Sequence, residues 1–250
     1  MLAAGEGRRV GHDSNKVLLP LAGRRVFTWA IRWARELSTV AHTVLVIREQ
    51  DRETVMATLA REVEPPSVTV VVGGDSRHGS EWAALQALAP LIESDQVDVV
   101  VIHDAARPLA STALFRDVIA AAWEHGGAIP AMTMSGLVPL DATAGMTNHE
   151  VAAVQTPQAF LAEPLLDAYR RADDDGFVGT DTASCIERYT DVSIRAVPSD
   201  ARNIKITFPE DLFLAERLLA RADFDLSGST EPVHHRWPHL RDLLRRGETP

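Results

Sequence analysis

The chain has 250 residues, of which 46% are hydrophobic and 24% are charged, and its formal net charge is −10. This composition is that of an ordinary globular protein and excludes a disordered chain, a collagen and a coiled coil. No apolar run approaches the ~20 residues of a membrane-spanning helix, and the acidic balance disfavours nucleic acid as the main partner. We see no signal-peptide pattern, and Cys185 is the only cysteine, so we expect a cytoplasmic protein without an internal disulfide.

The first half of the chain alternates between short β-branched runs and amphipathic stretches. Residues 43–47, 68–72 and 97–102 are continuous apolar runs, which are typical of strands covered on both faces. Helical patterns cover residues 27–37, 52–63, 80–92 and 113–123. This βαβ alternation predicts an α/β, Rossmann-like fold with a mostly parallel sheet and helices on both faces.

The second half is less regular. Residues 127–154 hold Gly, Pro, Thr and Met with weak alternation, which indicates an irregular or hairpin insertion. Helical patterns return at residues 163–172, 182–189 and 209–222, with a strand at 192–196. We therefore expect one nucleotide-binding domain over residues 1–222, with an arm at about 133–152 that could contact a second subunit. Residues 223–250 are expected to form a flexible tail.

A glycine-rich turn follows the first four residues. In a sheet protein such a turn normally follows a strand, but only Met1 to Ala4 precede Gly5. Either the first strand is very short, or the recorded start lies inside the gene. In the second case the centre of the sheet would be underfilled.

The opening stretch has the character of a phosphate-binding loop. Gly5 and Gly7 let backbone N–H groups approach an anion closely. Residues 1–25 hold five positive and two negative side chains, a local excess of positive charge in an acidic protein. A Walker motif is absent, and Val10 stands where a dinucleotide fingerprint needs its third glycine. The kind of phosphate ligand stays open at this point.

Four further motifs converge with this loop. Residues 73–77 and 103–108 follow predicted strands, and the carboxyl ends of strands are where open α/β sheets bind ligands. Residues 156–158 close the irregular region, and 203–207 precede the last helix. Only Lys16 and Lys205 are lysines, whereas the other 23 basic residues are arginine. Two isolated lysines inside such motifs indicate positions that need a compact, flexible point charge.

The ordered motifs AAGEGRRVG…NK, GGDSRHGS, HDAARP, VQTPQAF, GTDTASCIE and NIKITFPEDL resemble those of the 2-C-methyl-D-erythritol 4-phosphate cytidylyltransferases. The resemblance covers roughly residues 2–220. AAGxGxR is shared by many nucleotidyltransferases, whereas HDAARP with TPQ and NIKIT is specific to this family and to ribitol-phosphate cytidylyltransferases. The resemblance implies a nucleotide-diphospho-sugar transferase type of fold and a homodimer. It also implies CMP transfer from CTP to a sugar-alcohol phosphate, with Mg²⁺ and release of pyrophosphate.

The resemblance also implies roles for individual residues. The catalytic positions, which would stabilise the transition state or hold the incoming phosphate, are Arg9, Lys16 and Lys205. The nucleotide-binding positions are Ala3, Ala4, Gly5, Glu6, Gly7, Gly74, Asp75, Ser80, Ala105 and Ala106. The substrate-binding positions are Asp104, Arg107, Thr156 and Asp181. Asp104 would also hold the metal, since a hard carboxylate suits Mg²⁺.

The arm departs from the family pattern. Residues 135–138 read Ser-Gly-Leu-Val where the family has a DT-x-K-like segment, and Asn148 falls at the position of a phosphate-gripping arginine. The CTP half is thus preserved and the acceptor half is altered. Three hypotheses follow. The acceptor is methylerythritol 4-phosphate, it is another alditol or sugar phosphate such as ribitol 5-phosphate, or the chain is a nucleotide-binding paralogue without turnover.

Overall fold

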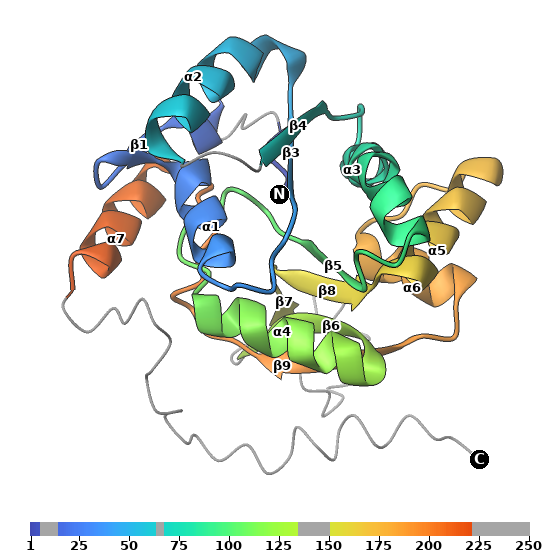
Figure 1. Ribbon diagram of the computed structural model, residues 1–250. Coiled ribbons are helices and arrows are strands. Elements are labelled where there is room, and N and C mark those ends of the chain that lie inside the picture. Colours follow the sequence, from blue (N-terminus) through green and yellow to red (C-terminus); the bar gives the residue numbers. More distant parts are fainter. Residues whose placement is uncertain (6–14, 64–67, 135–150, 222–250) are drawn as a thin grey trace, which may run out of the picture.

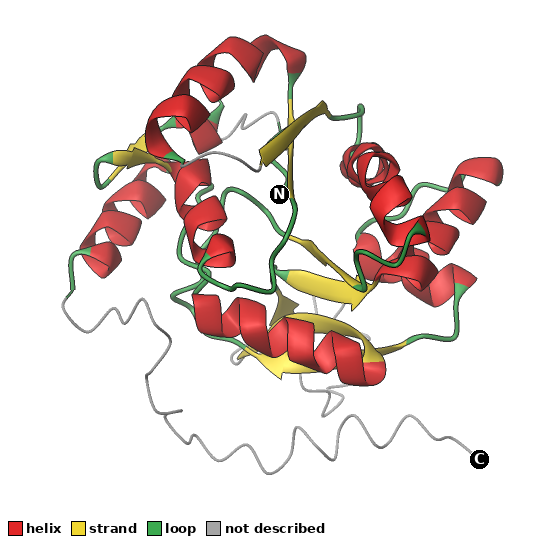
Figure 2. Cartoon of the chain, in the orientation of Figure 1, coloured by secondary structure: helices red, strands yellow, loops and turns green. Residues whose placement is uncertain are grey.

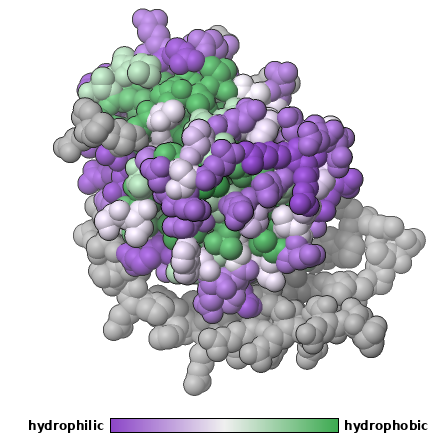
Figure 3. Space-filling model, turned by 45° about the vertical axis from the view of Figure 1, so that its right-hand side comes forward, coloured by the Kyte–Doolittle hydropathy of each residue, from purple (hydrophilic) through white to green (hydrophobic). Residues whose placement is uncertain are grey.

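The computed structural model describes residues 1–5, 15–63, 68–134 and 151–221 (Figure 1). In this part of the chain, strands form the middle of the molecule and helices surround them (Figure 2). Hydrophilic residues cover most of the face in Figure 3, with hydrophobic surface gathered mainly at its upper end. None of the described helices is long and apolar enough to cross a membrane.

The strands form two ladders. In the first, β3 (Thr43–Ile47) pairs in parallel with β4 (Val68–Val72), with Thr43 opposite Val68. The second has the order β5-β8-β6-β7, with β9 on the other edge of β6. Its strands are β5 (Val99–Ile102), β6 (Gly126–Met134), β7 (Val151–Val154), β8 (Gln158–Leu161) and β9 (Ser193–Pro198). β9 runs parallel to β6, whereas β8 runs antiparallel to both β5 and β6. A small hairpin of β1 (Pro20–Leu21) and β2 (Arg24–Arg25) lies apart from both ladders.

The first three residues join the two ladders. On one side, Leu2 makes a parallel bridge to Val46 of β3. On the other side, it makes a parallel bridge to Asp104, just beyond the end of β5. Its N–H donates to the carbonyl of His103 at 2.8 Å, and the N–H of Ala3 donates to the carbonyl of Val46 at 2.8 Å. The result is one mostly parallel sheet, because β3, residues 1–3, β5, β6 and β9 all run the same way. The predicted α/β, Rossmann-like fold is confirmed.

Helices cover both faces of this sheet. On one face lie α3 (Arg77–Glu93), α5 (Ala162–Asp174) and α6 (Thr182–Tyr189), which pack on Val100 and Ile102 of β5. On the other face α4 (Thr112–His125) packs beside Val99 and Val101, because successive strand residues point to opposite faces. The helices α1 (Val26–Arg35) and α2 (Arg52–Glu62) pack on β3. The last helix, α7 (Pro209–Leu219), packs near the small hairpin.

The region predicted to be irregular contains regular strands. β6 and β7 form an antiparallel pair, with Ala131 opposite Val154, so the hairpin interpretation holds for their described residues. Residues 135–150 and the tail beyond residue 221 lie outside the described part of the chain. β8 was not predicted. Gly127 is needed inside β6 because a Cβ there would lie 2.9 Å from the ring of Phe160, so a residue that normally weakens strands is required by close packing.

The amino group of Met1 provides a test of this arrangement. It donates to the carbonyl of Val44 at 2.9 Å, and burial lowers its pKa from 8.0 to about 6. The unfolded chain therefore binds this proton more tightly than the folded one, so stability rises with pH between about 6 and 8. We expect a gain of about 2–3 kcal/mol in the free energy of unfolding over that interval, measured by urea denaturation. The same chain with an acetylated amino group should lack this component, and an equal rise in both forms would contradict the assignment.

Candidate active site

A carboxylate held between two cations marks the carboxyl end of β5. Asp104 places Oδ1 2.5 Å from a terminal nitrogen of Arg77 and Oδ2 2.6 Å from Nζ of Lys205. Burial by itself would raise the pKa of Asp104, but the guanidinium and the ammonium outweigh it and hold this pKa far below its ordinary value of 3.8. Asp104 is therefore ionised at any physiological pH, and residues far apart in the sequence meet around it.

A neutral histidine fixes the backbone around this carboxylate. His103 is fully buried, and burial lowers its pKa to about 3. The N–H of Asp104 donates to Oγ1 of Thr156 at 3.0 Å, and that hydroxyl lies 3.1 Å from Nδ1 of His103. The hydroxyl therefore donates to Nδ1, and Nε2 of the ring donates to the carbonyl of Arg107 at 3.1 Å. The HDAARP and TPQ motifs thus support each other through one chain of hydrogen bonds.

The segment that carries Lys205 is attached to the same motifs. The guanidinium of Arg107 donates to the carbonyl of Asn203 at 2.7 Å. The amide of Asn203 in turn donates to the carbonyl of Thr156 at 2.9 Å, and its side chain is buried. Lys205 follows two residues later, and the next backbone N–H donates to Ala106 at 2.8 Å. These backbone contacts fix where the side chain of Lys205 begins, and the contact of its Nζ with Asp104 holds the ammonium in the cluster.

The glycine loop before α3 packs tightly against the start of the chain. A Cβ added to Gly73 would lie 2.6 Å from Oγ of Ser80 and 2.8 Å from Cβ of Ala4. A Cβ on Gly74 would lie 3.0 Å from the backbone of Gly79. The start of α3 thus lies against Ala4, and the N-terminus of a helix suits a phosphate. The two stretches predicted to bind nucleotide are in contact.

Substituting Gly73 tests this contact. We expect Gly73→Ala to lower the melting temperature by about 4–8 °C, because the new methyl group must push apart two packed segments. Gly5→Ala is the matched control, since a Cβ there meets nothing within 4 Å and should shift the melting temperature little. Differential scanning calorimetry of both variants measures the effect, and equal melting temperatures would show that the loop yields without cost.

A buried asparagine fixes the far end of the N-terminal loop. The amide of Asn15 donates to the carbonyl of Ala3 and to a carboxylate oxygen of Asp51, both at 2.8 Å. The loop therefore leaves and returns at the same edge of the sheet, and Lys16 begins the short helix η2 (Lys16–Leu18) at that edge. The remaining predicted residues of this loop, Glu6, Gly7 and Arg9, lie outside the described residues.

Comparison with known proteins identifies the family. The family model described as 2-C-methyl-D-erythritol 4-phosphate cytidylyltransferase matches residues 1–221. The chain belongs to this family. A curated cytidylyltransferase of that name from Symbiobacterium thermophilum is 37% identical over 223 residues, covering 87% of this chain and 90% of the relative. One from Parasynechococcus marenigrum is 38% identical over 224 residues, covering 87% and 95%.

A solved structure gives the same result. The crystal structure of 4-diphosphocytidyl-2C-methyl-D-erythritol synthase from Anaerococcus prevotii matches with a TM-score of 0.73 and 27% sequence identity. The match covers 88% of this chain and 96% of that chain. The cytidylyltransferase fold therefore extends over nearly all of the described residues.

The structure brings together most of the predicted site residues of this cytidylyltransferase family member, but not all. Asp104, Arg107, Thr156 and Lys205 form the network above, and the N–H of Ala105 donates to Leu2 at 3.0 Å. Asp75 lies exposed in the glycine loop. The carboxylate of Asp181 accepts from the N–H of Ser184 at 2.9 Å and caps α6. In the described part of the chain its structural task is this cap, so a substrate-binding role for Asp181 stays a prediction.

Two important residues were not predicted as site residues. Arg77 binds Asp104, and its Nε lies 3.0 Å from Oε1 of Glu81. Glu81 is 2% exposed, accepts from the hydroxyl of Thr182 at 3.0 Å and also accepts from the hydroxyl of Tyr169. Burial raises the pKa of Glu81, while Arg77 opposes that rise. The four-residue spacing of Arg77 and Glu81 was a usable signal, because such pairs face each other on a helix, but the predicted helix began only at residue 80 and left Arg77 outside it.

The side chains of the site differ from those of a metal centre built from protein ligands alone. Within the described ranges, no group of three or more His, Cys, Asp or Glu side chains could hold a metal ion. Mg²⁺, however, is usually held by one or two carboxylates together with substrate phosphates and water. Asp104 fits this pattern as a single protein ligand, provided that it shares an oxygen with Arg77 or Lys205.

Proposed function

We propose that this chain transfers CMP from CTP to 2-C-methyl-D-erythritol 4-phosphate, giving CDP-methylerythritol and pyrophosphate. The observation that carries the proposal is the cluster of Arg77, Asp104 and Lys205 beside the glycine loop and the N-terminus of α3. Membership of the cytidylyltransferase family supports it. Fixed positive charge next to an anion-binding helix terminus is what phosphoryl chemistry requires.

The reaction is an in-line displacement. An oxygen of the acceptor phosphate forms a bond to the α-phosphorus of CTP, the bond to the bridging oxygen breaks, and pyrophosphate leaves. Negative charge grows on the surrounding oxygens, so the protein acts chiefly by positioning and by electrostatic stabilisation. We assign Lys205, whose side chain is 40% exposed, to the incoming phosphate, and Arg9 and Lys16 to the charge around the α-phosphorus.

The roles of Arg77 and of the metal follow from the same cluster. Arg77 stays between Asp104 and Glu81 and keeps the Asp104 carboxylate in place. We propose that Asp104, together with the triphosphate, holds Mg²⁺. When bound, the ion neutralises charge on the phosphates. Ala105 and Ala106 follow Asp104 directly, and their small side chains would let the base and ribose approach the backbone closely.

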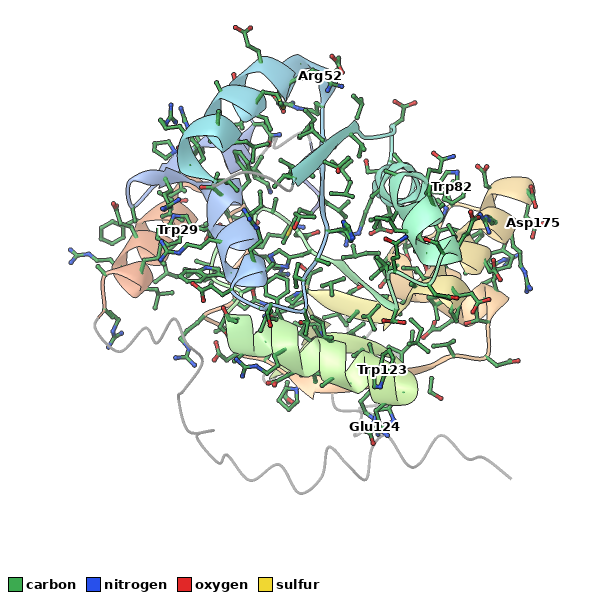
Figure 4. All side chains as sticks on the ribbon, in the orientation of Figure 1. Trp29, Arg52, Trp82, Trp123, Glu124 and Asp175 are labelled. Atoms are coloured by element: carbon green, nitrogen blue, oxygen red, sulfur yellow. The ribbon has the colours of Figure 1, made fainter. Side chains whose placement is uncertain are left out.

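Pyrophosphate release tests the proposal directly. We expect release from CTP and Mg²⁺ with methylerythritol 4-phosphate, and a loss of at least about 10²-fold in kcat for Lys16→Ala. Arg52→Ala is the control, since Arg52 lies on the surface of α2, where it pairs with Glu49 (Figure 4). Silence of the wild-type protein with this acceptor would overturn the assignment.

Ribitol 5-phosphate tested in parallel decides between acceptors. The alternative is motivated by Asn148 and by residues 135–138, which depart from the family pattern and lie outside the described residues. Turnover only with ribitol 5-phosphate would support a changed acceptor. CTP binding by calorimetry without turnover of either acceptor would support a non-catalytic paralogue.

We also propose a cytoplasmic homodimer in which the arm at about residues 133–152 contacts the second subunit. In such a dimer each subunit would extend its arm to the other. The arm would continue the antiparallel hairpin that β6 and β7 form within one chain. Light scattering on the purified protein should give twice the chain mass of 27.3 kDa. A mass of one chain at micromolar concentration would contradict the dimer.

A further inference from the structure

A buried carboxylate lies behind the cluster around Asp104. Glu81 follows the first turn of α3 and is 2% exposed. It accepts from the hydroxyl of Thr182 at 3.0 Å and from the hydroxyl of Tyr169. These donors belong to α6 and α5, which pack beside α3 (Figure 1). The two hydroxyls and the Arg77 guanidinium favour the ionised carboxylate and oppose the effect of its burial.

Arg77 connects this carboxylate to the site. Its Nε lies 3.0 Å from Oε1 of Glu81, and its Nη1 lies 2.5 Å from Oδ1 of Asp104. The Nε–H is not aligned with Oε1 as a hydrogen bond, so attraction between the two charges holds this end of the guanidinium. Arg77 therefore divides its donors between two carboxylates and does not give two parallel donors to one of them.

This division leaves the second oxygen of Asp104 to Lys205, whose Nζ lies 2.6 Å from Oδ2. Pairs of arginine and a carboxylate are frequently bidentate, with two parallel N–H···O bonds. A bidentate Arg77 would occupy both oxygens of Asp104 and would compete with Lys205 for Oδ2. The charge of Glu81 opposes that arrangement, because it attracts the Nε end of the guanidinium.

Glu81 also balances the charges of the cluster. Arg77 and Lys205 bring two positive charges to Asp104, which carries one negative charge. Glu81 supplies the second negative charge from the buried side, where an unpaired cation would be costly. The charge of Asp104 is therefore shared with Lys205 and is not taken up by Arg77 alone.

We propose that Glu81 is a positioning residue for cytidylyl transfer: it holds Arg77 on one oxygen of Asp104, so that the other oxygen keeps the Lys205 ammonium in place for the acceptor phosphate. Through Tyr169 and Thr182, the helices α5 and α6 support this arrangement. The inference rests on the proposed function for the role of Lys205, whereas the arrangement of the side chains can be measured without turnover.

NMR of the lysine side chains measures this arrangement in the ligand-free protein. The chain has only two lysines, so ¹³C-labelled lysine gives signals from Lys16 and Lys205 alone, and Lys205→Met assigns them. Glu81→Gln removes the charge and keeps the shape of the side chain. We expect this variant to displace the Lys205 signal, because the ammonium loses Oδ2 of Asp104, and to leave the Lys16 signal in place.

Glu93→Gln is the matched control for the NMR measurement. It is the same substitution on the same helix, and it breaks the surface pair of Glu93 with Arg170. This variant should displace neither lysine signal. A Lys205 signal that stays in place in Glu81→Gln would overturn the proposal. Equal displacement of both lysine signals in that variant would also overturn it, because it would show a general disturbance of the fold.

Steady-state kinetics measure the consequence for the reaction. We expect Glu81→Gln to lower kcat/KM for the acceptor by at least about tenfold and to leave KM for CTP within about threefold, because a displaced Lys205 no longer fits the incoming phosphate. Glu81→Asp keeps the charge on a shorter side chain and should recover part of the loss. A Glu81→Gln variant with an acceptor kcat/KM close to that of the wild type would overturn the positioning role.

Ile92→Val separates positioning from stability. It removes a buried methylene near the other end of α3, so it should lower the melting temperature by about 2–4 °C and leave kcat/KM within about threefold. If Ile92→Val lost as much activity as Glu81→Gln, stability would account for both losses and the proposal would be wrong. An inactive wild-type protein would overturn the proposed function instead, and the lysine signals would still decide whether Glu81 sets the position of Lys205.

Discussion

Replacing Lys205 by methionine is expected to lower kcat/KM for cytidylyl transfer by about 10³-fold, with a loss of only about 1 kcal/mol in the free energy of unfolding. Methionine keeps the length of the side chain and removes its charge. The side chain of Lys205 is 40% exposed, so its pair with Asp104 adds little to folding, while a fixed positive charge beside transferring phosphates adds much to the transition state. Steady-state pyrophosphate release and urea denaturation measure the two effects.

Two further variants sharpen this test. Lys205→Arg keeps the charge but replaces a compact ammonium with a planar fork, so we expect activity between those of the wild type and the methionine variant. Arg52→Met is the control for removal of an exposed cation elsewhere on the surface. Should Lys205→Met retain activity within threefold of the wild type, Lys205 is not part of the reaction.

Replacing Asp104 by asparagine should damage both folding and activity. Its carboxylate is 9% exposed and separates two cations, so the variant removes the anion between Arg77 and Lys205 and leaves Arg77 only its contact with Glu81. We expect a loss of about 3 kcal/mol in the free energy of unfolding at pH 7, typical of a broken buried ion pair. Activity should fall by at least about 10²-fold, since the cluster loses its geometry and the proposed Mg²⁺ ligand.

The pH dependence distinguishes this ion pair from a simple packing effect. Because the folded state holds the pKa of Asp104 far below 3.8, its contribution is present above about pH 4 and is lost as the pH falls below that value. The stability difference between wild type and Asp104→Asn should therefore be constant from pH 7 to 5 and shrink toward pH 3. Urea denaturation in buffer free of divalent cations measures it.

Asp200→Asn is the matched control for this series. Asp200 pairs with Arg202 at the surface, where their side chains are 53% and 57% exposed. Its loss should cost well under 1 kcal/mol at every pH, because solvent and salt screen exposed pairs. A difference for Asp104→Asn that does not change between pH 7 and pH 3 would show that packing, and not charge, accounts for it.

Local sequence patterns were sufficient to predict those strands and helices that depend mainly on their own residues. Residues 43–47 and 68–72 are strands as predicted, because continuous β-branched runs favour extended backbone. The expected burial on both faces holds for β3 but is wrong for β4, where Thr69 and Val72 are exposed and the other residues half-buried. The helix at 182–189 was also predicted with its observed bounds, and Asp181 caps it. The family followed from ordered motifs, and the comparisons bear it out.

The sequence patterns did not predict structure that depends on contacts with distant segments of the chain. The strand β8 is short and follows a proline, and it exists because β5 and β6 pair with it from both sides. Gly127 begins the region predicted to be an irregular or hairpin insertion, yet it lies inside β6, where the ring of Phe160 excludes any larger residue. No period in the sequence encodes such contacts, because they join segments that are tens of residues apart.

By itself the sequence determined the fold class, the family and the motifs that belong to the site. Only the tertiary structure decided which charges meet. It placed Lys205 on Asp104 across 101 residues, added Arg77 and Glu81 to the cluster, and made His103 a neutral support. Motif spacing reports which residues the chain supplies, whereas burial and the convergence of strand ends set their partners, their protonation and so their chemistry.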